Sequence, residues 1–325
     1  MLYAADTRAG IGGGHMGLVF GVDRVADSDG PGLRTVFLLK GCRLRCWWCH
    51  SPEGQRKQRE ILFHPSLCDS CATCLPECTS GAVRLEGGIP FLDRSKCRAC
   101  GLCIESCDTG AVEMSGWWMQ PGEAVERIER DRAELGDAYA GVTLSGGDVT
   151  LQPEFAKRIL RACRERGIHT AIETNGAAPW DVLQPMAELC DLILYDVKHM
   201  DSAEHERMTG VPNEQILDNL RALAANGAPV EAWMPLIPER NDTDENLKAT
   251  IAFVRSLGLR RIGFHPFEVF GREKYDALGR PYWLGHLETQ SEQRLSEILA
   301  LATAGGLEGW IVRTVEASSP VAEHA

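Results

Sequence analysis

Residues 40–50 of the chain read Lys40-Gly41-Cys42-Arg43-Leu44-Arg45-Cys46-Trp47-Trp48-Cys49-His50, with three cysteines in eight positions. The apolar run at residues 36–39, just before this stretch, is typical of a buried strand. Three thiolates suit a metal, but a structural zinc or a four-iron cluster usually takes four protein ligands. The stretch therefore raises the question of what fills the fourth position.

The composition is that of an ordinary globular protein, with 44% hydrophobic and 25% charged residues among 325. The net charge of −12 argues against a nucleic-acid-binding surface, which needs clustered lysine and arginine. No apolar run approaches the ~18 residues of a membrane span, and the Gly-rich residues 1–17 lack the apolar centre of a signal peptide. We expect residues 1–17 to be a disordered tail or a cloning remnant. We expect a cytoplasmic protein without nucleic-acid or membrane partners.

Thirteen cysteines need an explanation in such a protein, because a reducing compartment does not maintain structural disulfides. Eleven of them lie between residues 42 and 107. The other two, Cys163 and Cys190, stand alone in the sequence. We expect both to be buried core thiols, since free cysteine behaves as a small hydrophobic residue.

Residues 68–83 and 97–112 form an internal repeat, because both contain C-x2-C-x2-C-x3-C spacing and both end in Gly-Ala-Val. The spacing resembles that of bacterial two-cluster ferredoxins, in which the fourth cysteine of each run ligates the other cluster. This crossing implies one cluster on Cys68, Cys71, Cys74 and Cys107, and another on Cys97, Cys100, Cys103 and Cys78. A pair of zinc sites is the alternative, but zinc modules generally use two well-separated C-x2-C pairs. The repeat predicts an insert with two [4Fe-4S] clusters at residues 63–112.

Outside the insert, short apolar runs alternate with helix signals. The runs lie at residues 36–39, 142–144, 170–172, 192–195, 230–234 and 262–264. Helices are indicated between Pro153 and Gly167, before Gly227, and from a Thr243 cap to Gly258. Alternating strands and helices imply parallel βαβ units. Six units predict an α/β fold, a partial (β/α)6 barrel or strongly curved parallel sheet, at residues 18–62 and 113–318.

A motif follows each of the six runs. The first run leads into the Cys42 stretch, and the others into Ser145-Gly146-Gly147-Asp148, Glu173-Thr174-Asn175-Gly176, Asp196-Val197-Lys198-His199, Pro235-Leu236-Ile237-Pro238 and His265-Pro266-Phe267-Glu268. Each motif alone is weak, because a Gly-Gly-Asp is often a turn and an Asp-x-Lys often a surface ion pair. In parallel α/β folds, however, ligands bind at the carboxyl ends of the strands. Six motifs at six equivalent strand ends therefore predict one site.

Cys42-x3-Cys46-x2-Cys49 matches the motif of radical S-adenosylmethionine (SAM) enzymes. More narrowly, the chain resembles the activating enzymes of glycyl radical enzymes that carry a ferredoxin-like insert, such as those similar to pyruvate formate-lyase activating enzyme. The resemblance runs from about residue 20 to about residue 282. It includes Asp29-Gly30-Pro31-Gly32-Leu33-Arg34-Thr35, Pro52-Glu53, Gly146-Gly147, Thr174-Asn175-Gly176, Asp196-Val197-Lys198-His199-Met200-Asp201, Pro235-Leu236-Ile237-Pro238 and Gly271-x2-Lys274-Tyr275-x2-Leu278-Gly279.

The resemblance implies a reaction and its cofactors. The three cysteines would hold three irons of a [4Fe-4S] cluster, and the fourth iron would bind the amino and carboxylate groups of SAM. Reductive cleavage would then give a 5′-deoxyadenosyl radical, which removes a hydrogen from a backbone glycine of a partner glycyl radical enzyme. We expect three [4Fe-4S] clusters, SAM and, as in some relatives, a monovalent cation. We expect ferredoxin or flavodoxin to deliver electrons through the insert of a strictly anaerobic enzyme.

The resemblance also implies roles for individual residues. The expected cofactor-binding residues are Trp48, Gly146, Gly147, Asp148, Glu173, Thr174, Asp196, Lys198 and Glu268. Lys198 and Asp196 are the expected catalytic residues, Lys198 as partner of the methionyl carboxylate and Asp196 reaching the ribose or a cation. Gly146 and Gly147 would let backbone groups approach the methionyl amine. Glu173 matches an acidic position that helps bind a cation in some relatives.

The chain departs from the family pattern at several positions. Ser51 stands where Asn is usual, and Val149 where Pro is usual. Trp233 replaces an arginine, and Glu268 replaces a histidine. The last two positions touch the cofactor region in relatives, so we expect the nucleoside contacts to differ here.

Three other functions stay open at this point. A radical SAM enzyme could use the insert as auxiliary clusters and act on a small molecule or peptide. A neighbouring gene for a glycyl radical enzyme would favour the activating enzyme over it. A ferredoxin-like electron carrier would have no need of an open iron, and a zinc-stabilised interaction module would not explain the motifs at the strand ends. Residues after 282, with a helix signal near 291–302 and an apolar run at 310–312, receive no role.

Overall fold

The computed structural model describes residues 16–26, 29–269 and 271–313. Within these residues the strands form one nine-stranded sheet and two two-stranded sheets, and the large sheet has the order β13-β12-β11-β10-β9-β8-β2-β1-β7. Its central strands are parallel neighbours: β2 (Leu33–Leu39), β8 (Tyr139–Gly146), β9 (Thr170–Thr174), β10 (Leu192–Asp196), β11 (Val230–Pro235) and β12 (Arg261–His265). These are the six predicted strands, so the expected parallel α/β sheet is confirmed.

Three further strands extend the sheet beyond the prediction. β13 (Glu308–Ile311) pairs in parallel with β12, whereas β1 (Gly17–Ala26) runs antiparallel to β2, and β7 (Trp117–Met119) antiparallel to β1. The apolar run at residues 310–312 thus belongs largely to an edge strand. The prediction of a disordered tail was wrong at Gly17, because Gly17 is the first residue of β1 and pairs with Met119 of β7. Residues 1–15 of that tail, and residues 314–318 of the predicted barrel, lie outside the described residues.

The helices that connect these strands are α3 (Pro121–Leu135), α4 (Pro153–Glu165), α5 (Trp180–Ala187), α6 (Ser202–Thr209), α7 (Glu214–Ala225), α8 (Asp244–Ser256), α9 (Arg272–Ala277) and α10 (Glu292–Ala304). Helices α4, α7 and α8 lie where the sequence signals predicted, and α10 covers the helix signal near 291–302, whereas the other connecting helices were not predicted. Thr243 caps α8 by accepting a hydrogen bond from the Asn246 amide. In the described part of the chain, no helix is long and apolar enough to cross a membrane.

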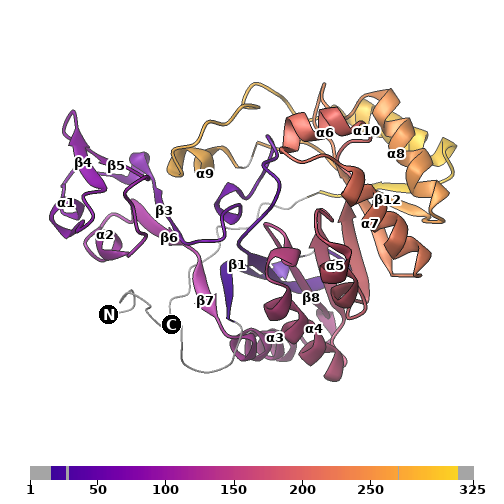
Figure 1. The fold of residues 1–325 in the computed structure, drawn as a ribbon, viewed down its shortest axis with the longest axis horizontal. Coiled ribbons are helices and arrows are strands. Elements are labelled where there is room, and N and C mark those ends of the chain that lie inside the picture. The colour runs from indigo at the N-terminus through magenta and orange to yellow at the C-terminus, as the bar shows by residue number, and fades with distance from the viewer. Residues whose placement is uncertain (1–15, 27–28, 270, 314–325) are drawn as a thin grey trace.

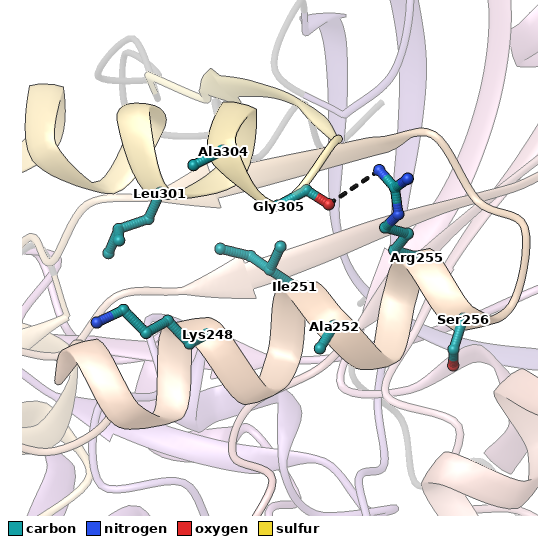
Figure 2. A pocket seen from close by; sticks show the side chains of 8 residues that line it. All are labelled: Lys248, Ile251, Ala252, Arg255, Ser256, Leu301, Ala304 and Gly305. Atoms are coloured by element: carbon teal, nitrogen blue, oxygen red, sulfur yellow. Dashed lines mark hydrogen bonds between the residues drawn. The ribbon is translucent and has the colours of Figure 1, made fainter.

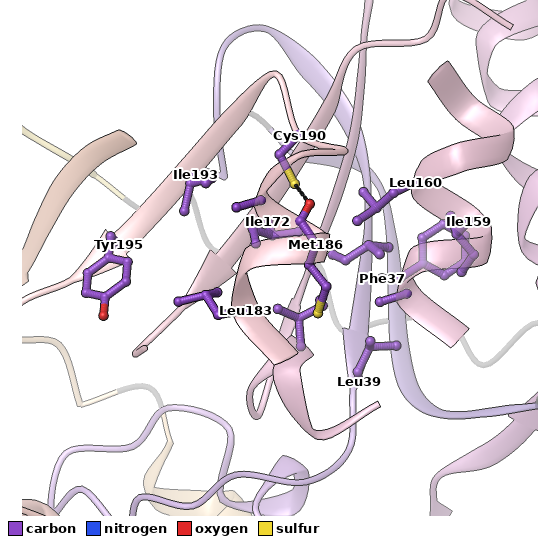
Figure 3. Packing of buried hydrophobic residues seen from close by; sticks show 14 of the residues in the cluster. Phe37, Leu39, Ile159, Leu160, Ile172, Leu183, Met186, Cys190, Ile193 and Tyr195 are labelled. Atoms are coloured by element: carbon purple, nitrogen blue, oxygen red, sulfur yellow. Dashed lines mark hydrogen bonds between the residues drawn. The ribbon is translucent and has the colours of Figure 1, made fainter. Parts of the chain in front are cut away.

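The main hydrophobic core lies between the sheet and its helices. Phe37 and Leu39 of β2 pack with Ile159 of α4 and Met186 of α5 in this core (Figure 3). Cys163 and Cys190 are buried in the same core, and Cys190 Sγ donates a hydrogen bond to the Met186 carbonyl at 3.1 Å. The prediction that both are core thiols is confirmed.

The cysteine repeat folds into a small unit that projects from one side of the large sheet (Figure 1). Its elements are β3 (Glu60–Phe63), α1 (Cys74–Glu77), β4 (Val83–Glu86), β5 (Ile89–Leu92), α2 (Leu102–Glu105) and β6 (Val112–Ser115). β3 pairs antiparallel with β6 from Glu60↔Ser115 to Phe63↔Val112, and this pair forms the base of the insert. The short helix α9 lies between the insert and the rest of the molecule, with Ala277 and Leu278 packed on Leu62 of β3.

A surface depression of about 610 Å³ lies between α8 and α10 on the outside of the molecule (Figure 2). Ile251 and Leu301 form part of its apolar wall, and Arg255 closes one end by donating to the Gly305 carbonyl at 3.0 Å. None of the residues predicted to bind a cofactor lines it.

Candidate functional site

The three-cysteine stretch forms a loop directly after β2, at the carboxyl end of the central strands. Backbone hydrogen bonds fix both of its halves: the Cys42 amide donates to the Gln55 carbonyl at 3.0 Å, and the Arg45 amide to the Thr209 carbonyl at 2.7 Å. Cys42, Cys46 and Cys49 are all partly buried. The loop is therefore held by the chain that follows it and by the end of α6.

The three thiols lie close enough to influence one another. Burial, opposed by the nearby Lys198 ammonium and reinforced by Cys49, raises the pKa of Cys46 to about 12. Burial, Asp148 and the other two thiols likewise raise the pKa of Cys42. Grouped, buried thiolates need cationic partners, which iron would supply. This donor set fits a cluster ligated by three cysteines.

Two amide side chains donate hydrogen bonds to these sulfurs. Asn175 Nδ2 lies 3.5 Å from Cys42 Sγ, and the Gln55 side chain bonds the Cys49 thiol. Hydrogen bonds to cluster sulfurs are one of the ways a protein tunes cluster potential. Sequence reasoning assigned neither residue a role. Asn175 stood in a recognised motif, whereas nothing in the sequence marked Gln55.

Lys198 and Asp196, the expected catalytic residues, form a nearly buried ion pair at the end of β10. Lys198 Nζ donates to Asp196 Oδ2 at 2.7 Å. Burial alone would lower the pKa of Lys198, but Asp196 and the Cys46 and Cys42 thiols outweigh it, so the pKa stands above its ordinary value. The pair therefore faces the cysteine loop and keeps a cation there at neutral pH.

Glu173 joins this group from β9. Burial, then the carboxylates of Asp196 and Asp29, raise its pKa to about 8, and the Ser145 hydroxyl donates to it. Its surroundings therefore favour the protonated carboxyl over the carboxylate. In the described residues, no three His, Cys, Asp or Glu side chains form a group suited to one shared metal ion. Ligands of a four-iron cluster each bind a different iron and stand farther apart.

The Asp148 carboxylate forms hydrogen bonds within the protein. Its Oδ2 accepts from the Thr174 hydroxyl and the Asn175 amide, both at 2.9 Å, and its Oδ1 accepts from the Thr150 amide at 2.9 Å. The carboxylate is buried, so these bonds replace its hydration. The geometry gives Asp148 and Thr174 a positioning role: they connect the end of β8 to the residue that bonds Cys42.

The two glycines before Asp148 allow this turn to lie against the cysteine loop. A Cβ at Gly146 (φ +107°) would meet the Leu39 amide nitrogen at 2.4 Å, and one at Gly147 would meet the Gly41 carbonyl oxygen at 2.4 Å. The Gly147 amide donates to the Leu39 carbonyl at 2.8 Å. Because the Gly147 amide already donates to Leu39, a methionyl amine at this segment would donate its hydrogens to backbone carbonyl oxygens.

Trp48 belongs to the three-cysteine loop, and Glu268 lies beside it. Trp48 packs in an apolar cluster with Met208, against which Cys46 also packs. Glu268 follows β12, where its carbonyl lies 3.0 Å from the His50 ring. The structure shows packing for Trp48 and a backbone contact for Glu268.

The family departure at Trp233 places an indole inside the barrel. Its ring lies 4.4 Å, centroid to centroid, from that of His265 on the next strand. Trp233 Nε1 and His265 Nε2 are buried without a hydrogen-bond partner among the described residues. Burial lowers the pKa of His265 to about 4, so the ring is neutral. These two unpaired nitrogens lie at or close in sequence to positions 233 and 268, where relatives are expected to contact the nucleoside.

The insert groups its thiols across the repeat. Burial and the thiols of Cys68, Cys107 and Cys71 raise the pKa of Cys74, so Cys107 of the second run lies with the first. The thiols of Cys100 and Cys78 act on Cys97 in the same way, and those of Cys97 and Cys100 act on Cys103, which also lies near Cys74. The Thr73 hydroxyl also donates to the Ser106 carbonyl at 2.8 Å, connecting the two runs. The two groups have the membership that crossed ligation requires.

Two family models match the chain. Residues 97–254 match the radical SAM superfamily, and residues 28–135 match a 4Fe-4S single cluster domain. The second match covers both the three-cysteine loop and the insert.

The chain is also similar to characterised proteins along most of its length. It is 40% identical to choline trimethylamine-lyase activating enzyme of Oleidesulfovibrio alaskensis, over 82% of this chain and 88% of that protein. It is 37% identical to trans-4-hydroxy-L-proline dehydratase activating enzyme of Clostridioides difficile (88% and 96%), and 32% identical to pyruvate formate-lyase 2-activating enzyme of Escherichia coli K12 (89% and 90%). A solved domain of a pyruvate-formate lyase-activating enzyme from Bacteroides vulgatus is 32% identical over 53% of this chain and 98% of that chain, with a TM-score of 0.45.

Proposed function

The chain belongs to the radical SAM activating enzymes of glycyl radical enzymes, and from this premise we propose that Cys42, Cys46 and Cys49 hold its SAM-binding cluster. It is an enzyme that uses a [4Fe-4S] cluster and SAM to generate a glycyl radical. One observation carries the assignment of the site: three grouped thiols lie beside the Lys198–Asp196 pair at the carboxyl end of the central strands.

When bound, the cluster and SAM supply a carbon-centred radical strong enough to remove a hydrogen atom from glycine. The residues around them bind, orient and shield. Lys198 would hold the methionyl carboxylate, Asp196 would keep Lys198 in place, and the Gly146–Gly147 carbonyls would receive the amine. Trp233 and His265 would offer their unpaired nitrogens to the nucleoside. Asn175 and Gln55 would tune the cluster through its sulfurs.

We assign two further clusters to the insert at residues 63–112, one to Cys68, Cys71, Cys74 and Cys107, and the other to Cys97, Cys100, Cys103 and Cys78. The crossed grouping of the thiols supports this assignment. The donor would be ferredoxin or flavodoxin, with the insert relaying electrons. Cys71 is exposed, so oxygen would reach the first of these clusters, and the enzyme would work only without oxygen. So many reduced thiols also favour the cytoplasm.

The partner would be a glycyl radical enzyme that presents its glycine on a loop. The relatives named above activate a lyase, a dehydratase and pyruvate formate-lyase 2, each according to its own name. We propose a partner of this class for the present chain.

Replacing Lys198 with methionine tests the SAM contact. Methionine keeps the length of the stem but removes the ammonium, so the affinity for SAM should fall about 10- to 100-fold, the worth of one hydrogen bond to a charged group. Equilibrium binding of SAM to the reconstituted protein measures this directly.

Lys248→Met is the matched control, because Lys248 is a largely exposed lysine on α8 away from the cysteines. It should bind SAM as the unmodified protein does. Unchanged SAM affinity in Lys198→Met would show that the carboxylate is held elsewhere.

A further inference from the structure

Both ends of the three-cysteine loop meet a group of charged residues at the base of the insert, all but one of them largely buried. The group consists of Lys40, Glu53, Glu60, Lys274 and Arg280, here called the ionic joint. The functional assignment above uses none of these five residues.

Lys40 is the centre of the ionic joint. It lies two residues before Cys42 and its side chain is fully buried. Its Nζ donates to the Glu53 carbonyl at 2.6 Å and to Ser115 Oγ at 3.2 Å, and lies 3.6 Å from Glu60 Oε2. One ammonium thus contacts the chain after the cysteine loop and both strands at the base of the insert, since Glu60 is on β3 and Ser115 on β6.

The segment around α9 closes the ionic joint from the other side. Lys274 Nζ pairs with Glu53 Oε1 at 2.6 Å, and Arg280 Nη2 pairs with Glu60 Oε1 at 2.5 Å. Arg280 also donates to the Pro52 carbonyl at 2.7 Å. Residues separated by more than two hundred positions in the sequence therefore hold the loop and the insert together.

A glycine next to the ionic joint leaves room for the side chain of Lys40. Gly116, at the corner between β6 and β7, has φ +107°, and a Cβ there would lie 2.7 Å from Cδ of Lys40. Glycine at this corner leaves the space that the lysine stem fills. Arg94 of the insert adds a second connection, donating to the Ile61 carbonyl at 2.6 Å and to the Ala277 carbonyl of α9.

Stability alone is a poor reason for such a group. Burying charges costs desolvation, and a well-packed apolar set is often as stable or more so. What buried ion pairs do provide is a defined geometry, because each charge must meet its partner or lose several kcal/mol. The ionic joint lies where geometry matters, between the insert thiols and the loop of Cys42, Cys46 and Cys49.

We propose that the ionic joint is a positioning device that fixes the insert relative to the three-cysteine loop and so sets the rate at which electrons cross between them. The inference rests on the proposed placement of clusters at both locations. The step it governs is one-electron transfer: an insert cluster is oxidised, the loop cluster is reduced, and no bond forms or breaks. The electron comes from an external low-potential donor.

Glu60→Gln tests the proposal, because the amide keeps the shape of Glu60 while removing the charge that Arg280, Arg56 and Lys40 share. After mixing with reduced donor, rapid-freeze EPR should show the insert clusters reduced at the unmodified rate. Reduction of the SAM-responsive cluster should be slowed roughly 10- to 100-fold, the scale of effect that small misplacements have on positioned reactions. Amide hydrogen exchange in β3 and β6 should rise in the same variant before any cluster is loaded.

Glu113→Gln is the matched control, since Glu113 is also a glutamate at the base of the insert but pairs with His64 at the surface. Lys274→Met is the second variant, because its side chain is partly exposed and its loss leaves the buried Lys40–Glu60 contact intact. It should slow the same electron transfer.

The possible outcomes separate the two proposals. Unmodified transfer rates in both Glu60→Gln and Lys274→Met, with all clusters present, would overturn the positioning role. Loss of clusters from both variants would overturn it too, because the ionic joint would then serve folding. If the unmodified protein itself shows no SAM-responsive cluster, the assignment of the loop has failed, and the positioning role falls with it.

Discussion

Cys46→Ser should lose SAM cleavage and glycyl radical formation entirely, while the protein keeps its fold and its insert clusters. Serine is isosteric but a poor ligand for iron, so the loop would retain only two thiolates. Iron content should fall by about a third, because one of three four-iron clusters is lost. Iron analysis together with chromatographic measurement of 5′-deoxyadenosine checks both expectations.

Cys163→Ser is the control for this change. Cys163 is fully buried, but it lies on the core-facing side of α4 rather than in the loop. The variant should keep all of its iron and its activity and lose about 1–3 kcal/mol of unfolding free energy, because a hydroxyl enters an apolar site. A Cys46→Ser protein that still cleaves SAM at the unmodified rate would contradict the assignment of the loop.

Cys107→Ser should remove the insert cluster that the first cysteine run holds, although Cys107 belongs to the second run. The reason is the crossed grouping, in which Cys107 lies beside Cys68, Cys71 and Cys74. SAM cleavage driven by a protein electron donor should fall to the rate seen without a donor, because one of the two insert clusters that relay electrons is missing. The SAM-responsive cluster should remain. Donor-driven SAM cleavage and the EPR spectrum of the reduced variant measure the two effects.

Cys78→Ser provides the matched comparison, since it is the corresponding cysteine of the first run. It should also lose one cluster, but the remaining insert signal should be that of the other cluster. A residual insert spectrum in Cys107→Ser that matches the one left by Cys103→Ser, rather than the one left by Cys74→Ser, would rule out crossed ligation.

The sequence was informative where a single local pattern determines structure. Thr243 and Pro153 mark helix starts, and both helices begin there. The six apolar runs became six parallel strands, because hydrophobic periodicity reflects burial directly. The edge strands β7 and β13 were harder to predict: they are short, and their residues are only partly buried, so their place depends on pairing with distant strands.

The candidate site shows the same division. The cysteines and the Asp196-x-Lys198 pair could be identified from the sequence, because their spacing alone indicates metal ligands and a charged pair at a strand end. Asp148 was expected to touch the cofactor, yet its carboxylate accepts bonds from Thr174 and Asn175, which only the folded arrangement of β8 and β9 makes possible. Gln55 and the ionic joint escaped prediction for the same reason, since their partners lie far away in sequence.

The departures from the family pattern now have a location. Trp233 lies inside the barrel against His265, where it brings an unpaired ring nitrogen in place of the arginine expected from relatives. Glu268 lies at the His50 ring. Neither residue is one of the three loop cysteines, so the cluster assignment does not depend on them.

Low-temperature EPR of anaerobically reconstituted, dithionite-reduced protein, recorded with and without SAM, tests the central assignment most directly. We expect signals of three four-iron clusters, one of which changes when SAM is added, because we assign an open iron only to the cluster at Cys42, Cys46 and Cys49. Two clusters and no change on adding SAM would contradict the assignment of the three-cysteine loop.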